Sequence, residues 1–260
     1  MLSLFAAALL SLPPIQIDRI DRSPWCHGVY ASDLAAVSTA AFEAEKAVQY
    51  TFCVRSTANY QCAFYGTEGK LRVRKHTAVA HGTAFAVEKS ASGARLMTNE
   101  HVVSWPRVTS TSAKVSGVPA GCKLLGVNNS VVESETDSFA GDDTPLRLVV
   151  SDRRLDAALL EGPVTVADIP FAVGQSSRLS VGNAVQVRGF PLGAFQAVAG
   201  GKVVNAARLD RDGHWAHTDF VISAPLSPGN SGSPVLAVSC KTGALELVGV
   251  FHALWPDGGG

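Results

Sequence analysis

The sequence has little charge for its length and no net charge of either sign. Charged residues make up 17% of the 260 residues, and 22 Lys and Arg side chains are balanced by 22 Asp and Glu side chains. A neutral chain has no general attraction to nucleic acid or to acidic lipid, so no nucleic-acid partner is predicted. With 47% hydrophobic residues and 24 glycines, the composition also argues against a disordered chain or a coiled coil.

Long apolar runs are also missing. No run reaches 18 residues, so no stable membrane span is predicted. The dense apolar stretch at residues 1–13 (MLSLFAAALLSLP) has the length of a signal-peptide core, although it lacks a leading Lys or Arg and a clear cleavage site. We predict residues 1–27 as a leader and export to the periplasm or the medium if residues 1–13 act as a signal peptide. The alternative is a terminal helix lying on a cytoplasmic domain.

Cysteine is scarce and odd in number, and its spacing matches no zinc pattern. The five positions are Cys26, Cys53, Cys62, Cys122 and Cys240. Cys53 and Cys62 flank a region that predicts a hairpin, so an exported chain could join them by a disulfide. Buried thiols are the other interpretation.

No metal site and no cofactor are predicted. A zinc enzyme that used histidines is one rival interpretation, but the pair His214 and His217 lacks the Glu and the third ligand of a zinc peptidase. The other histidines weighed for this site are His76 and His81. A secreted scaffold without catalytic activity is a second rival.

Helical periodicity is confined to residues 31–50, where it predicts one helix with Ser32 as its N-cap. Elsewhere Gly, Pro, Ser, Asn and Asp separate short apolar or alternating runs that predict strands. These runs cover residues 49–54, 83–87, 94–98, 146–150, 157–160, 184–188, 201–206, 220–223, 234–238 and 245–251. Many short strands and one helix indicate an all-β sandwich or barrel. A break near residues 162–170 predicts two units, residues 28–165 and 166–260.

Three short segments carry the chemistry. His101 lies in TNEHVV, and Asp156 leads an apolar strand, where a carboxylate is disfavoured and needs a donor. Ser231 lies between glycines in PGNSGSP, a tight turn in which backbone N–H groups can converge on one point. His, then Asp, then Ser is the chain order of chymotrypsin-type peptidases.

These segments resemble the trypsin-like serine peptidases of the chymotrypsin fold, in particular the HtrA/Deg group without its PDZ domain. The resemblance covers about residues 47–260. Besides the segments of His101, Asp156 and Ser231, it rests on GTAF at 82–85, GFPLG at 189–193, and LVGV followed by PDGG at 247–259. It implies two six-stranded-type antiparallel β-barrels, here preceded by a helix, with His and Asp in the first and Ser in the second. The second barrel is expected to stop short of the family pattern at the C-terminus.

The resemblance implies a serine endopeptidase that acts on proteins or peptides. Ser231 is the expected nucleophile, His101 its base, and Asp156 the partner that orients His101. The N–H groups of Gly229 and Ser231 form the expected oxyanion hole. HtrA-like proteins are often trimers, so a trimer is expected by resemblance.

The specificity pocket is expected around the serine loop and the last strand. The candidate residues are Pro225, Leu226, His252, Ala253 and Leu254. Four of them are apolar, which favours small or medium aliphatic side chains at P1, the substrate residue before the cleaved bond. His252 leaves alternatives open, because it could donate to Asp156 or recognise an acidic side chain as in glutamyl endopeptidases. An inactive binding module with the peptidase fold is a further alternative.

Overall fold

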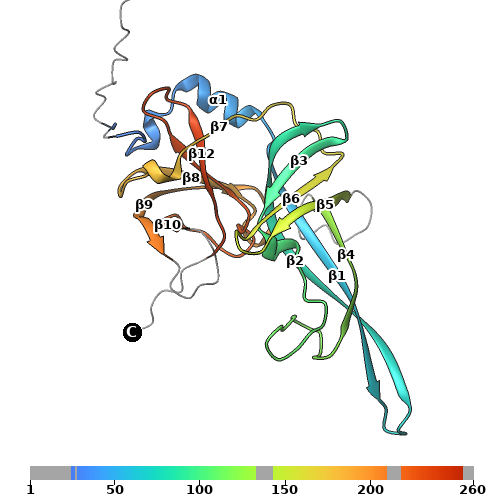
Figure 1. Ribbon diagram of the computed structural model, residues 1–260. Coiled ribbons are helices and arrows are strands. Elements are labelled where there is room, and N and C mark those ends of the chain that lie inside the picture. Colours follow the sequence, from blue (N-terminus) through green and yellow to red (C-terminus); the bar gives the residue numbers. More distant parts are fainter. Residues whose placement is uncertain (1–24, 27, 133–142, 210–217, 254–260) are drawn as a thin grey trace, which may run out of the picture.

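Two β-sheets dominate the structure, a computed structural model that describes residues 25–26, 28–132, 143–209 and 218–253 (Figure 1). Two short helical elements precede them, η1 (Leu34–Ala36) and α1 (Thr39–Ala47). Within the described residues, no helix has the length and apolar character needed to cross a membrane. The predicted leader, residues 1–27, lies outside the described part except for Trp25 and Cys26.

The first sheet is a closed barrel in the order β1-β2-β3-β6-β5-β4. Its strands are β1 (Thr51–Tyr65), β2 (Leu71–Ser90), β3 (Gly93–Thr98), β4 (Lys123–Val132), β5 (Thr144–Asp152) and β6 (Ala157–Gly162). The short helix α2 (Glu100–Val103) follows β3. All neighbouring strands are antiparallel. Alternating side chains such as Val54, Leu96 and Leu160 fill the barrel and form its core.

The second sheet has six strands in the order β10-β9-β8-β11-β12-β7 and is open among the described residues. Its strands are β7 (Ala172–Val173), β8 (Ala184–Gly189), β9 (Ala197–Leu209), β10 (Thr218–Ile222), β11 (Pro234–Val238) and β12 (Leu245–Val250). The short turns η2 (Ser176–Arg178) and η3 (Pro191–Gly193) connect them. The all-β prediction of two six-stranded units with an N-terminal helix is confirmed, with the second unit a half-barrel.

The N-terminal segment packs on the second sheet, although the sequence-based division grouped it with the first barrel. The Ala31 N–H donates to the Val238 carbonyl (2.9 Å), and the Ala184 N–H donates to the Ala31 carbonyl (2.8 Å). Ser38, not Ser32, caps the helix, because its Oγ accepts from the Ala41 N–H. The predicted cap is therefore wrong, and the helix starts later than expected.

A buried ionic network joins this helix to the sheets. Glu45, 1% exposed, accepts from Arg188 of β8 (2.7 Å) and from the Tyr50 hydroxyl (2.6 Å). The Arg188 guanidinium also lies 5.5 Å from the Tyr50 ring centroid. Burial and the Glu45 carboxylate raise the pKa of Tyr50, so its hydroxyl stays protonated and donates.

The disulfide considered between Cys53 and Cys62 does not form, and for Cys53 the structure shows the other interpretation, a buried thiol. Both residues lie on β1, where nine residues of extended strand hold their Cα atoms roughly 30 Å apart. The disulfides instead join Cys26 to Cys240 and Cys62 to Cys122, with Cα separations of 5.7 and 4.2 Å. Cys53 remains a buried thiol whose Sγ lies 3.8 Å from the Gly193 carbonyl oxygen.

Candidate active site

His101 and Asp156 are in direct contact at one end of the first barrel. His101 is in α2, and Asp156 ends the turn that leads into β6. The His101 Nδ1 lies 2.8 Å from Asp156 Oδ2, and the His101 backbone N–H donates to Oδ1 (3.0 Å). The carboxylate is buried, with its side chain 3% exposed, whereas the His101 side chain is 42% exposed. The imidazole is therefore fixed on one side and open on the other.

The backbone around Asp156 holds the carboxylate in place. Asp156 has a φ of 46°, a left-handed conformation that is uncommon outside glycine. Two hydrogen bonds support this turn. The Asn99 side-chain amide donates to the Asp156 carbonyl (2.9 Å), and the Arg154 N–H donates to Asp152 Oδ1 (2.8 Å). Because an ionised carboxylate only accepts, the proton of the neutral imidazole lies on Nδ1, which leaves Nε2 as an acceptor.

Ser231 lies in the turn that enters β11, and the turn is tied to the end of β12. The Gly232 N–H donates to the Phe251 carbonyl (2.8 Å), and the Phe251 N–H donates to the Ser233 carbonyl (2.8 Å). Gly229 and Gly232 have φ values of 93° and 88°. Residues that carry a side chain rarely adopt this backbone conformation, so the turn depends on glycine at both positions.

The serine turn meets the first barrel at Gly82 and Thr83. The Thr83 N–H donates to the Ser231 carbonyl (2.8 Å). A Cβ atom on Gly82 would lie 2.6 Å from a Val102 methyl and 3.1 Å from the Ser231 carbonyl oxygen. The helix of His101 and the turn of Ser231 therefore approach the same glycine. In the described part of the chain, no hydrogen bond joins the Ser231 hydroxyl to His101.

Thr83 was missed as a site residue, and it connects the serine turn to a second loop. Its Oγ1 donates to the Gly229 carbonyl (2.9 Å) and accepts from the Phe190 N–H (3.0 Å). Its own carbonyl accepts from the Thr98 hydroxyl (2.7 Å). The only sequence signal was its place in the segment GTAF, which indicates a strand but not these partners.

The peptide before Gly229 is oriented by η3. The Leu192 N–H donates to the Pro228 carbonyl (2.6 Å). In a trans peptide the C=O and N–H groups point in opposite directions, so the Gly229 N–H points away from η3. A Cβ on Gly229 would lie 2.7 Å from the Leu192 nitrogen. Among the described residues, neither the Gly229 N–H nor the Ser231 N–H donates to a protein acceptor.

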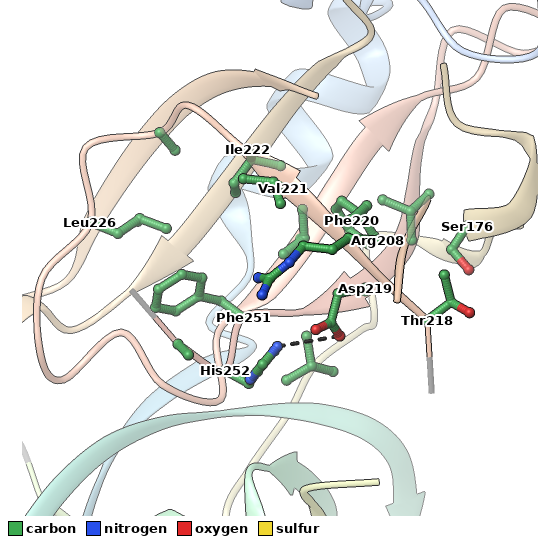
Figure 2. A pocket seen from close by; sticks show the side chains of 16 residues that line it. Ser176, Arg208, Thr218, Asp219, Phe220, Val221, Ile222, Leu226, Phe251 and His252 are labelled. Carbon is green, nitrogen blue, oxygen red and sulfur yellow. Dashed lines mark ion pairs between the residues drawn. The ribbon is translucent and has the colours of Figure 1, made fainter. Parts of the chain in front are cut away.

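A pocket of about 280 Å³ lies between β10 and the end of β12, and Phe251, whose backbone is hydrogen-bonded to the serine turn, lines it (Figure 2). Three of the predicted pocket residues, Leu226, His252 and Ala253, line it. Pro225 is exposed and does not line it, and Leu254 lies outside the described residues. Ile222 and Phe251 add apolar wall.

The pocket also has a polar side, of which the sequence predicted only His252 and missed Asp219 and Arg208. His252 Nε2 lies 3.4 Å from Asp219 Oδ1, so the structure pairs His252 with Asp219 and not with Asp156. Arg208 of β9 lies opposite Asp219 of β10, and Figure 2 shows these three side chains gathered on one side. His252 and Asp219 lie 33 residues apart (252 − 219) on segments that do not pair directly, so local sequence patterns could not bring them together. In the described residues, no cluster of three His, Cys, Asp or Glu side chains could hold a metal.

Comparisons with known proteins identify the family. The family model of the trypsin-like peptidase domain matches residues 82–250. The chain belongs to this family. The matched segment contains His101, Asp156 and Ser231, and the predicted serine-peptidase family is confirmed. A comparison with curated protein sequences found no match.

Solved structures of HtrA-type proteases are similar to the chain. A variant of the HtrA-type protease AlgW with a decapeptide has a TM-score of 0.49 and 19% identity over 84% of this chain and 60% of that one. The same variant with a tripeptide has a TM-score of 0.46 and 21% identity over 78% of this chain and 52% of that one. Deg5 has a TM-score of 0.44 and 19% identity over 75% of this chain and 78% of that one. This chain thus spans about half to three fifths of the AlgW structures that it matches.

Proposed function

We propose that the protein is a serine endopeptidase that cleaves peptide bonds in proteins through Ser231, His101 and Asp156. The observation that carries this proposal is the His101–Asp156 contact, with a buried carboxylate on Nδ1 (2.8 Å) and an exposed imidazole edge. It is supported by the turn of Ser231, which reaches the same junction through Thr83 and Gly82. Family membership independently supports this chemistry.

The reaction has two steps, acylation of Ser231 and hydrolysis of the acyl-enzyme. The Ser231 Oγ forms a bond to the scissile carbonyl carbon while its proton moves to His101 Nε2. The C–N bond then breaks, and His101 returns the proton to the leaving amine, which leaves an acyl-enzyme. Water repeats the sequence with His101 as the base, releases the acid and restores Ser231. Asp156 holds the imidazole and stabilises its charged form.

The N–H groups of Gly229 and Ser231 form the proposed oxyanion hole. Two observations support this role. The Gly229 N–H faces away from η3, and among the described residues neither N–H group donates a hydrogen bond to a protein acceptor. Loss of one such donor typically raises the barrier by about 3–4 kcal/mol. Thr83 acts as a positioning residue, since its hydroxyl binds the Gly229 carbonyl.

The pocket favours small or medium aliphatic P1 side chains. Leu226, Ile222 and Phe251 supply apolar wall. Arg208 and His252 also line the pocket and would suit the glutamyl alternative, but Asp219 lies opposite Arg208 and its carboxylate already binds His252. An acidic P1 side chain would therefore have to compete with Asp219 for His252.

Two disulfides support export. Cys26–Cys240 and Cys62–Cys122 are typical of oxidising compartments and rare in the cytosol. Because Cys26 is bonded to Cys240 in the folded domain, a cleaved leader would end before Cys26 and would be shorter than the expected residues 1–27.

The proposal is tested by incubating the protein with an unfolded substrate such as reduced casein and sequencing the products by mass spectrometry. Wild type should release fragments that end in small or aliphatic residues, and Ser231→Ala should release none. Fragments that end in Glu would support the glutamyl alternative. Folded wild-type protein without any cleavage or acyl-enzyme would support the inactive binding module instead.

A further inference from the structure

A two-stranded ribbon extends beyond the first barrel (Figure 1). β1 and β2 pair out to Tyr65 and Leu71, but β4 pairs with β1 only as far as Gln61, and β3 pairs with β2 only from Phe85 onward. Residues 63–75, here called the arm, are all exposed except Gly66, which is half-buried. An isolated two-stranded hairpin is marginally stable in water, so the arm would gain from a partner surface.

The base of the arm is fixed firmly. The Cys62–Cys122 disulfide ties β1 to the segment before β4, and the Tyr60 hydroxyl donates to the Pro106 carbonyl (3.0 Å). Ala58, Tyr60 and Ala78 pack in a small core beside the disulfide. The arm is therefore presented in one direction by a rigid base.

One face of the arm is apolar toward its tip and ends at Lys75, which lies opposite Gln61 on the same face. Residues directly opposite in an antiparallel pair share a face, and Tyr65 pairs with Leu71 while Ala63 pairs with Val73. Tyr65, Leu71 and Val73 are 77%, 61% and 55% exposed. Large apolar side chains gathered at an exposed tip are typical of an interaction site.

The arm is also cationic, in a chain whose net charge is zero. Its cations are Lys70, Arg72, Arg74 and Lys75, and its one acid is Glu68. Glu68 lies 3.8 Å from Arg72 and 4.0 Å from Lys70. The Arg74 guanidinium lies 5.6 Å from the Phe64 ring centroid. Arg74 and Lys75 have no carboxylate within the arm to offset their charge.

We propose that the arm docks on an anionic phospholipid bilayer, with Tyr65 and Leu71 at the apolar boundary and Arg74 and Lys75 on the headgroups. Tyrosine and aliphatic side chains bordered by cations suit this boundary, where one end is apolar and the other wet. A projecting tip can reach a flat surface without the barrels obstructing it. Each cation near such a surface raises binding about five-fold, so the docking is reversible and weakens with salt.

Co-sedimentation with vesicles tests the proposal without using peptidase activity. Wild type should bind phosphatidylcholine vesicles that contain phosphatidylglycerol and should not bind phosphatidylcholine alone. Arg74→Gln with Lys75→Gln should lower the partition coefficient about 30-fold. The matched control, Arg178→Gln in η2 with Lys202→Gln in β9, changes the net charge equally at exposed positions and should change binding less than about two-fold.

A second variant tests the apolar face. Tyr65→Ser with Leu71→Ser should also weaken binding to anionic vesicles, with an unchanged melting curve showing that the barrels remain folded. Absence of vesicle binding, or an equal loss in the arm and control variants, would overturn the proposal. Arm-dependent self-association or heparin binding without vesicle binding would also overturn it, and would point to a second copy or to a polyanion.

Discussion

The two parts of the candidate active site are held in different ways. His101 and Asp156 both come from the first barrel and bind each other directly, through two hydrogen bonds of 2.8 and 3.0 Å. Ser231 lies in the second sheet, and its turn is held from outside by Thr83 of the first barrel, by η3 and by Phe251.

The two parts should therefore respond differently to substitutions. The proposed acid–base pair, His101 and Asp156, lies within one barrel, so changes at the junction of the sheets should leave their contact intact. The serine turn depends on contacts across the junction, so the same changes should alter its position and lower turnover. Substitutions within the pair, in the buried network and around the serine turn test this contrast.

The largest effect is expected within the pair. Asp156→Asn should lower kcat about 10⁴-fold, because an amide that donates to the imidazole favours the wrong tautomer. Turnover of a peptide substrate measures this effect. Asp168→Asn is the control, since it removes the same charge from an exposed side chain. Equal losses in both variants would show that the pair has no special role.

The next effect concerns the junction. Glu45→Ala should lower the free energy of unfolding by about 3–5 kcal/mol, because Arg188 and the Tyr50 hydroxyl would stay buried without their acceptor. Urea denaturation measures this change. Glu43→Ala on the exposed side of the same helix should cost less than about 0.5 kcal/mol. Similar values for the two variants would contradict the buried network.

Thr83→Val tests the hold on the serine turn. It keeps the shape of the side chain but removes the hydroxyl that binds the Gly229 carbonyl and the Phe190 N–H. We expect kcat to fall roughly 10²-fold through misplacement of the turn, with a smaller change in KM. Thr83→Ser should restore most of the turnover. If the Ser variant is as slow as the Val variant, the hydroxyl is not what holds the turn.

The smallest effect is expected at Ser233, which provides a neighbouring control. Its buried Oγ has no hydrogen-bond partner among the described residues. Ser233→Ala should therefore change kcat less than about two-fold, and stability should stay equal or rise. Steady-state kinetics and a melting curve measure both quantities. A loss as large as that of Thr83→Val would mean that any change beside the turn disturbs it.

The sequence predicted those features that short segments determine. The strands, the family and the segments of His101, Asp156 and Ser231 each depend on a few neighbouring residues. The length of β2, twenty residues, was underestimated. Its N-terminal part mixes polar and apolar residues and buries neither face, so the alternation typical of a half-buried strand is missing there. β4 was missed because Gly126, Asn128 and Asn129 within it favour turns.

Contacts between distant segments could not be predicted. The Cys53–Cys62 prediction failed because one strand continues through the expected hairpin. Asp219 is the partner of His252, 33 residues away (252 − 219), and Glu45 is the partner of Arg188, 143 residues away. Such pairs are set by strand order and packing, which local periodicity does not contain.

Fluorophosphonate labelling of the folded protein, with the label mapped by mass spectrometry, tests most directly whether His101 activates Ser231. We expect a label on Ser231 that is strongly reduced by His101→Ala and only slowed by Thr83→Val. A label on another residue, or labelling of Ser231 at the same rate without His101, would contradict it.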